Sequence, residues 1–201
     1  MSRLLLALPV LACLAPGLAR ADVDLLVARG LGDELVDVPL ALAATPQGLV
    51  VAGAGAQLWS AAGEPLGPRI SGDVDDIAAL GEGLVAVGPG GLVALDALGE
   101  VAWQVAPARL GERDDDTRWR VAADGRTVVV LAHDTIHTFA ADGRVLGRWS
   151  SEATLVALAV DGDLVAASGR REVACADEPR DVPVLVATDL LGSPRWSAYD
   201  H

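Results

Sequence analysis

The sequence predicts an all-β protein made of four similar units, each a four-stranded antiparallel sheet. Short apolar segments alternate with Gly, Asp and Pro residues of the kind that form hairpin turns. The first strands of the units begin at residues 40, 76, 119 and 155, which gives intervals of 36, 43 and 36 residues. No interval contains a helical period of ten or more residues. Because this is the length of a propeller blade, we expect a β-propeller of about four blades, either a closed small ring or part of a larger propeller.

Each unit is expected to contain four strands in chain order. In the first unit, residues 40–70, these are Leu40–Thr45, Leu49–Gly53, Gln57–Ala61 and Leu66–Ile70. In the second, residues 76–105, they are Asp76–Leu80, Leu84–Gly88, Leu92–Ala97 and Val101–Val105. In the third, residues 119–150, they are Trp119–Ala123, Thr127–His133, Thr135–Ala140 and Val145–Ser150. In the fourth, residues 155–200, they are Leu155–Asp161, Leu164–Gly169, Val184–Leu190 and Arg195–Asp200, with an insertion before the third strand.

Composition supports a packed interior and excludes some partners. Apolar residues make up 52% of the chain and aromatic residues 3%, so the core must consist mostly of Ala, Val and Leu. Segments such as LVVAG and LVAVG are apolar throughout, which predicts sheets covered on both faces, as in stacked blades. The chain has 28 acidic and 15 basic residues, and its formal charge of −13 repels phosphate backbones. Nucleic-acid binding is therefore not expected.

The N-terminus has the pattern of a signal peptide over residues 1–21. Arg3 precedes an apolar stretch, and Ala19-Arg20-Ala21 forms a small-x-small cleavage site before Asp22. The apolar stretch is too short to span a membrane, and no later segment is longer. We therefore expect an exported protein, periplasmic or extracellular, whose propeller repeats occupy residues 22–201. A minor alternative is a lipoprotein, because residues 10–13 resemble a lipobox ending at Cys13.

The segment after the signal peptide and the cysteine residues each allow more than one structural interpretation. Val23–Ala28 is one more strand candidate, which could pair with the last unit or remain from a lost blade. After cleavage Cys175 would be the remaining cysteine, so no internal disulfide is expected. Its acidic neighbours Asp177 and Glu178 disfavour a reactive thiolate, and we expect a half-buried structural residue.

The last hairpins of the second and fourth units share the pattern A-x-D-x-L-G-x-x-x-W. The matching residues are Ala94, Asp96, Gly99 and Trp103 in one hairpin and Ala187, Asp189, Gly192 and Trp196 in the other. This pattern resembles the tryptophan-docking repeat of quinoprotein-type β-propellers, those of pyrroloquinoline quinone proteins. The resemblance implies that each Trp packs on the neighbouring blade while the Asp and Gly fix the turn.

The other two units depart from the quinoprotein-type repeat. The third unit keeps Ala140, Gly143 and Trp149, with the Trp displaced by two residues. The first unit keeps Gly63 and carries Trp59 on the preceding strand. The Thr of the family pattern is missing from all four units. The resemblance thus covers residues 40–200 as an architecture but only two hairpins closely.

Possible metal ligands occur in two places. His133 and His137 lie on one expected hairpin, whose two-residue turn would be His133-Asp134. The turn would direct Asp134 away from His137, and no further ligand is near in sequence, so we expect both His residues to be exposed strand residues. The run Asp114-Asp115-Asp116 lacks the alternating oxygens of a calcium loop and is expected to be a solvated connection. No metal site is expected.

The sequence is compatible with several functions. Quinoprotein dehydrogenases use an adjacent Cys pair and an Asn, and this chain has neither, so no catalytic residue and no cofactor are expected. The sequence favours a non-enzymatic binding or scaffold module that meets another protein through blade loops, above all Arg109–Arg118 and Arg170–Pro183. A homodimer that completes a ring is an open option. The alternatives are a truncated or degenerate quinoprotein-type oxidoreductase and, more weakly, a carbohydrate-binding or lyase-type propeller.

Overall fold

The computed structural model describes residues 41–53, 55–60, 62–113, 117–174 and 179–199. Several sequence-based expectations lie outside these residues. They concern the signal peptide at 1–21, Cys13, the strand candidate Val23–Ala28, Leu40, Asp114–Asp116 and Cys175.

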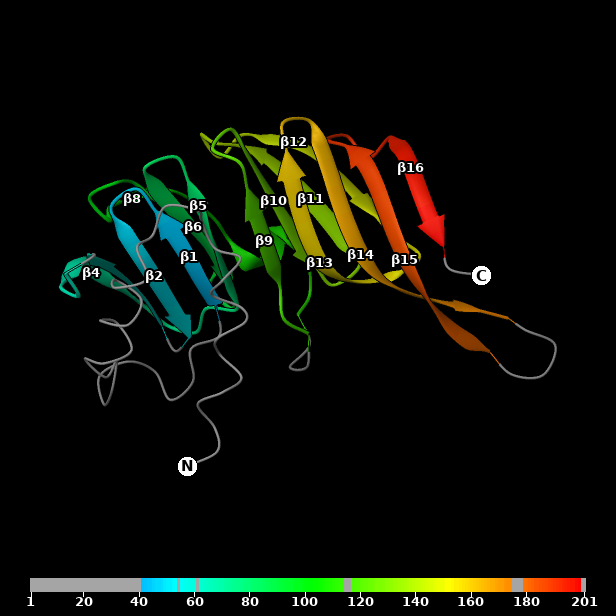
Figure 1. The fold of residues 1–201 in the computed structure, drawn as a ribbon, viewed down its shortest axis with the longest axis horizontal. Coiled ribbons are helices and arrows are strands. Elements are labelled where there is room, and N and C mark those ends of the chain that lie inside the picture. Colours follow the sequence, from blue (N-terminus) through cyan, green and yellow to red (C-terminus); the bar gives the residue numbers. More distant parts are fainter. Residues whose placement is uncertain (1–40, 54, 61, 114–116, 175–178, 200–201) are drawn as a thin grey trace, which may run out of the picture.

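The described residues form four antiparallel four-stranded sheets, each with its strands in chain order (Figure 1). The first sheet contains β1 (Ala41–Thr45), β2 (Gly48–Gly53), β3 (Gly55–Ser60) and β4 (Pro65–Ser71). The second contains β5 (Asp76–Leu80), β6 (Gly83–Gly88), β7 (Gly91–Leu95) and β8 (Val101–Val105), followed by the 3-10 turn η1 (Pro107–Arg109). The third contains β9 (Arg120–Ala123), β10 (Thr127–Ala132), β11 (Thr135–Ala140) and β12 (Val145–Ser150). The fourth contains β13 (Thr154–Asp161), β14 (Leu164–Val173), β15 (Arg180–Asp189) and β16 (Pro194–Tyr199).

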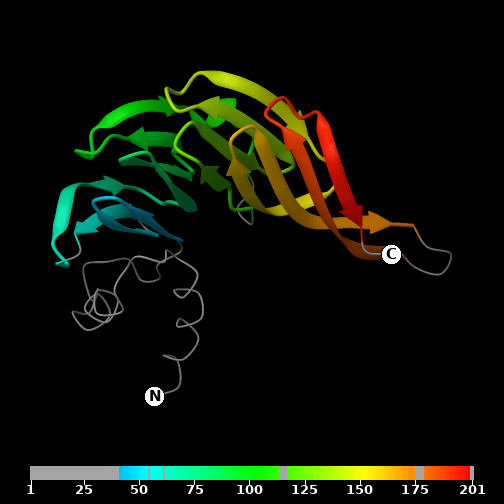
Figure 2. The same ribbon diagram turned by 45° about the horizontal axis from the view of Figure 1, so that its top comes forward.

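The sheets follow one another in a curved row. The first strands lie side by side, with β1 next to β5, β5 next to β9 and β9 next to β13. Figure 2 shows the resulting arc, with the first sheet at one end and the fourth at the other. Among the described strands, no extensively packed pair joins the first sheet to the fourth. The structure therefore has the open arrangement of a partial larger propeller and not that of a closed four-blade ring.

Burial along the strands follows from this stacking. Every residue of β6 and of β10 is buried, because each strand lies in a sheet with neighbours on both faces. The prediction that continuously apolar segments are covered on both sides is correct for these two strands. In the fourth sheet, β14 instead alternates between buried and more exposed positions over Leu164–Ala167, because only one of its faces meets another described sheet.

The core consists of three apolar clusters, one at each interface between successive sheets. Small residues such as Ala52, Ala86 and Ala167 lie within these clusters, as the composition predicts. The largest fully buried side chains are Trp119 and Phe139, both between the second and third sheets. The two largest of the fully buried side chains thus lie at the same interface.

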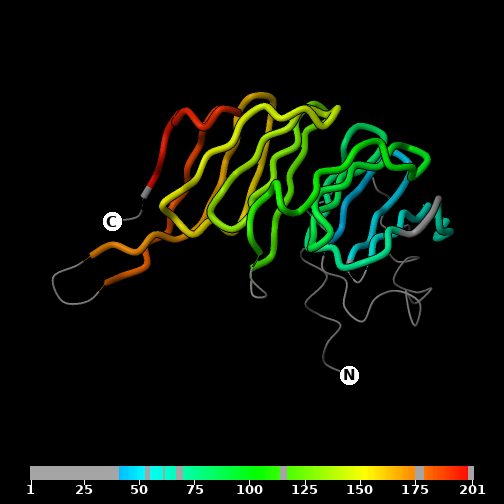
Figure 3. Tube along the Cα trace, turned by 180° about the vertical axis from the view of Figure 1, so that it is seen from behind, coloured from blue at the N-terminus to red at the C-terminus, as the bar shows by residue number. Residues whose placement is uncertain are grey.

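The largest departure from the expected strands occurs in the fourth unit. The segment between residues 170 and 183 is not simply a loop, because β14 and β15 continue their antiparallel pairing as far as Val173 and Arg180. Figure 3 shows this long hairpin as an arm that extends past the other sheets. Its charged residues allow strand pairing without burial, and this is why the hydrophobic pattern did not reveal it.

Candidate interaction surface

The turn between the last two strands has the same backbone structure in all four sheets. In the second sheet, Asp96 Oδ1 accepts hydrogen bonds from the backbone N–H groups of Leu98 and Glu100, both at 2.9 Å. The N–H of Gly99, at φ +79°, donates to the carbonyl of Asp96 at 3.0 Å. A positive φ of this kind favours glycine because it has no Cβ. The Asp and the Gly of the repeat therefore both stabilise the turn.

The equivalent carboxylate in the fourth sheet is held in the same way. Asp189 Oδ1 accepts from the backbone N–H groups of Leu191 at 2.9 Å and Ser193 at 2.8 Å. The backbone hydrogen bond from Ser193 lowers the pKa of this carboxyl, with smaller lowering contributions from Leu191 and Arg195. Asp189 is therefore ionised at neutral pH and acts as a fixed acceptor for the turn.

Trp103 joins the second sheet to the third. It lies on β8 directly opposite Ala94, and its Nε1–H donates to the carbonyl of Ala141 in the next sheet at 2.8 Å. The indole covers Gly143, where a Cβ would come within 2.7 Å of the ring. Its ring centroid is 6.3 Å from that of Phe139. The absence of a side chain at Gly143 is thus required for the indole to approach.

Trp149 makes the corresponding contact between the third and fourth sheets. It lies on β12 opposite Ile136 and covers Gly192, where a Cβ would come within 2.5 Å of the ring. Its displacement by two residues in the sequence does not prevent the docking. Unlike Trp103, it has a buried Nε1 with no hydrogen-bond partner among the described residues.

Trp196 occupies the matching place on the fourth sheet, but no described sheet follows it. It lies on β16 opposite Ala187, which is fully buried, while Trp196 itself is 48% exposed. The register puts it on the face that points away from the third sheet, together with exposed Leu164 and Leu185. Val156, beside the bulge of β13, is exposed as well. We call these four residues the outer face of the fourth sheet.

This outer face has the composition of a buried propeller interface. Between its large residues lie small ones, Ala159 and Ala166, in register with Ala187. An uncovered apolar patch of this kind on one sheet face is typical of an interaction surface. Sequence analysis identified Trp196 as a docking residue but could not show that no described sheet packs against it.

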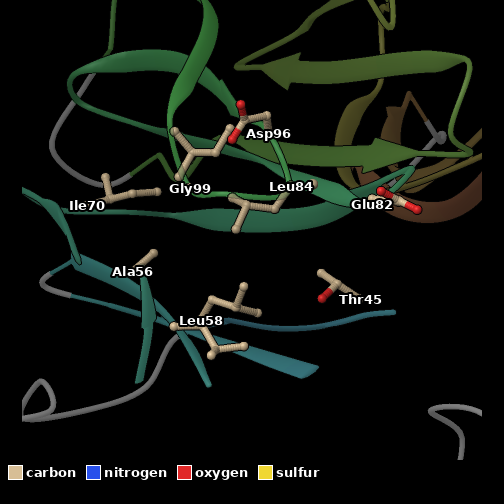
Figure 4. A pocket seen from close by; sticks show the side chains of 11 residues that line it. Thr45, Ala56, Leu58, Ile70, Glu82, Leu84, Asp96 and Gly99 are labelled. Atoms are coloured by element: carbon tan, nitrogen blue, oxygen red, sulfur yellow. The ribbon is translucent and has the colours of Figure 1, made fainter. Parts of the chain in front are cut away.

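The interface between the first and second sheets lacks a docked Trp. The outer strand β4 contains none, and Trp59 lies on β3 opposite Leu49, on the face turned away from the second sheet. A small pocket of about 10 Å³ lies at this interface (Figure 4). Gly99 and Asp96 of the docking turn line it, together with Leu58 of β3. Among the described residues, the core of this interface consists of aliphatic side chains alone.

A buried ionic contact connects the second sheet to the chain segment that leads into the third sheet. The sequence analysis did not single out its residues. Asp75 is 4% exposed, and its Oδ1 accepts from Arg113 Nη2 at 2.9 Å while its Oδ2 accepts from the backbone N–H of Trp119 at 3.2 Å. The adjacent Asp76 Oδ2 accepts from the N–H of Val121 at 3.0 Å. Burial raises the pKa of Asp76, and the two backbone hydrogen bonds it accepts partly oppose this.

The first expected contact loop, Arg109–Arg118, therefore has a structural role in its described part. Leu110 is 1% exposed, and Arg113 pairs with Asp75. The second, Arg170–Pro183, is the exposed arm of β14 and β15, where Arg171 forms an ion pair with Glu152 at 3.0 Å. Of these two segments, the arm is the more accessible.

One expectation for the two His residues is wrong. His133 lies in the two-residue turn, as expected, and is exposed, but His137 is only 5% exposed. His137 Nε2–H donates to the carbonyl of Leu110 at 2.8 Å, and its ring stacks near Phe139. Burial lowers the pKa of His137, and the charge of Arg148 lowers it further, against the hydrogen bond to Leu110. The neutral imidazole is thus a core residue that binds the η1 segment.

In the part of the chain that the structure describes, no group of three or more His, Cys, Asp or Glu residues is arranged to hold a metal ion. The same residues include no helix of the length and apolarity that a membrane crossing needs.

Comparison with known proteins identifies the fold. No protein-family model and no curated protein sequence matches the chain. Among solved structures, BBS1N in complex with ARL6DN has a TM-score of 0.60 at 17% identity, over 83% of this chain and 54% of that one. The Pan2 WD40 domain of Neurospora crassa has a TM-score of 0.59 at 12% identity, over 80% of this chain and 52% of that one. BamB from Moraxella catarrhalis has a TM-score of 0.48 at 16% identity, over 81% and 62%.

The two neighbours with TM-scores of 0.60 and 0.59, together with the four-sheet architecture, define the chain as a β-propeller protein. It spans about half the length of the two matched structures with the higher TM-scores. At these identities the comparison establishes the fold and nothing further about activity.

Proposed function

We propose that this chain is an exported, non-enzymatic propeller of the quinoprotein-like type, and that it acts by binding another protein at the outer face of the fourth sheet. The observation that best supports the proposal is that the side chain of Trp196 is half exposed. The equivalent Trp103 and Trp149 each cover a glycine turn of the next sheet, whereas Trp196 lies on an apolar face that no described sheet covers.

Two further observations support a binding role. The arm of β14 and β15 continues past the end of the fourth sheet and offers backbone and charged groups there (Figure 1). One of the matched propellers, BBS1N, is described in complex with another protein, ARL6DN. Assignment to the quinoprotein-like type rests on the A-x-D-x-L-G-x-x-x-W hairpins at residues 94–103 and 187–196.

Photo-crosslinking in the native host tests the binding role. A photoreactive amino acid at position 185, on the outer face, should yield a covalent adduct with a protein. The same amino acid at position 145, where Val145 is 48% exposed on β12, is the matched control and should yield none. Equal adducts from both positions, or none from position 185, would contradict the proposed surface.

Two measurements test the remaining parts of the proposal. Mass spectrometry of the N-terminus should find a mature chain that begins at Asp22, whereas a lipid-modified Cys13 would establish the lipoprotein alternative. A titration with pyrroloquinoline quinone and Ca²⁺ should show no uptake. Tight stoichiometric binding of the quinone would instead favour a quinoprotein-type oxidoreductase.

A further inference from the structure

We infer that the segment directly before β1, residues 22–40, folds back over the outward face of the first sheet and closes that end of the arc to other molecules. The segment lies outside the described residues, so the evidence is the face that it would cover. That face is turned away from the second sheet, and the strand register places these side chains on it: Leu42, Leu49, Val51, Gln57 and Trp59. The outer face of the fourth sheet lies at the other end of the arc and is not part of this contact.

The outward face of the first sheet is covered. Val51 is 1% exposed and Gln57 9%, and Nε1 of Trp59 is buried. The four residues that define the outer face of the fourth sheet are instead 38% to 56% exposed. Outside the first sheet, β5 is the only described strand that packs extensively against β1–β4, and it lies on the opposite side. Since these exposures are those of a single chain, the atoms that cover Val51 and Gln57 belong to this chain.

The same position in the other three sheets shows what such a cover is. Val51 is the fourth residue of the second strand of its sheet, and the fourth residues of the other second strands are Ala86, Val130 and Ala167. Each of these three is buried in the apolar cluster that its sheet forms with the sheet before it. At every described interface, therefore, the chain directly before a sheet provides the cover. For the first sheet, that chain is residues 22–40.

Trp59 occupies a position that receives a side chain elsewhere in the arc. It lies opposite the second residue of β2, as Phe139 lies opposite the second residue of β10. The ring centroid of Phe139 is 6.3 Å from that of Trp103, which comes from the preceding sheet. The turn after Trp59 has the glycine conformation of the docking turns, with φ +76° at Gly63. An apolar side chain of residues 22–40 is therefore expected to pack against Trp59.

The segment has the length and the composition for this contact. Residues 23–28 and 35–38 are its two mainly apolar stretches, and Gly30 and Gly32 lie between them. Fully extended, the segment would span ~60 Å, whereas a four-stranded sheet is about 15 Å wide, so it can cross the face and turn back. Because it is joined to β1, the contact is intramolecular and forms at a high effective concentration.

Photo-crosslinking in the purified chain, expressed with its own N-terminal segment, tests this contact. Benzoylphenylalanine replaces Leu49 on the covered face, isotopically labelled and unlabelled chains are mixed, and the adducts are mapped by mass spectrometry. We expect an adduct between position 49 and a peptide from residues 22–36 of the same isotopic form. The matched control is the same replacement at Val145 on β12, which should give no adduct with that segment. Adducts between the two isotopic forms, equal adducts from both positions, or none from position 49 would overturn the inference.

Hydroxyl-radical footprinting measures the same cover without a crosslinker. In the unmodified chain, Trp59 should be oxidised at least twofold more slowly than Trp196, whose side chain is 48% exposed. Deletion of residues 22–36 should raise the rate at Trp59 at least twofold, while the fully buried Trp119 stays slow because the variant is folded. An unchanged rate at Trp59 after the deletion would overturn the inference and leave the proposed function intact. An adduct between position 185 and residues 22–36 would count against both, because the segment would then cover the outer face of the fourth sheet.

Discussion

Replacing Trp103 by Ala should destabilise the chain far more than the same change at Trp196. The first substitution removes a hydrogen bond to Ala141, worth about 1 kcal/mol, and an aromatic contact with Phe139, worth ~1 kcal/mol. It also leaves a void over Gly143, so the total loss should be about 3 kcal/mol. Trp196 is 48% exposed, and its replacement should cost ~1 kcal/mol or less.

Urea unfolding followed by far-UV circular dichroism measures both losses. It should be done at one fixed, low protein concentration, because any association between chains would add to the apparent stability. Equal losses for the two substitutions, or a loss below ~1 kcal/mol for Trp103→Ala, would refute the docking geometry described above.

A double-mutant cycle tests the same contact more directly. Gly143→Ala forces a Cβ toward the indole of Trp103, in addition to the strain of φ +83°. In the Trp103→Ala background only the strain remains, so the two losses should fall short of additivity by ~1 kcal/mol. Gly125→Ala is the matched control, since Gly125 has φ +87° and a Cβ added there would meet no atom closer than 3.8 Å. Its loss should be the same in both backgrounds, and additivity for Gly143 would exclude the contact.

Two further predictions concern buried polar groups at the same interface. Because burial lowers the pKa of His137, the unfolded chain, with an ordinary pKa of 6.5, binds the proton first as the pH falls. The stability that His137 contributes is present above its unfolded pKa and is lost as the pH falls toward the lowered folded-state pKa. His137→Gln keeps a donor for the Leu110 carbonyl and does not titrate, so unfolding curves between about pH 7 and about pH 5 should show a smaller decrease in stability. Asp75→Ala leaves the guanidinium of Arg113 without its carboxylate and should cost about 3 kcal/mol in urea unfolding; an unchanged midpoint would show that the pair contributes nothing.

The repeat and most of the strands could be predicted from the sequence because they depend on local properties. Turn glycines such as Gly99 and Gly192 mark positive φ, and continuously apolar segments such as those of β6 and β10 mark strands covered on both faces. These signals lie within a few residues of the structure they determine. The strand order within each sheet then follows from short hairpin connections.

The contacts between sheets were harder to predict, because they join residues far apart in the chain. The partner of Asp75 is Arg113, and His137 is buried by Leu110, which comes from a connection with no strand pattern of its own. The position of His137 in an alternating segment of apolar and polar residues gave no sign of the η1 segment that covers it. Whether a side chain at a propeller interface is buried depends on the neighbouring sheet. The periodicity of residues within one strand therefore does not predict that burial.

The difference between contacts within a sheet and contacts between sheets is clearest at Trp196. Its local pattern is identical to that of Trp103, with an Ala directly opposite on the adjacent strand and an Asp and a Gly in the preceding turn. Only the next sheet differs: it is present for Trp103 and absent among the described residues for Trp196. Since the turn and the strand register are the same, the outer face of the fourth sheet is already shaped to receive another blade. On the proposed function, a blade-like partner would bind this face with less reorganisation than a flexible peptide would.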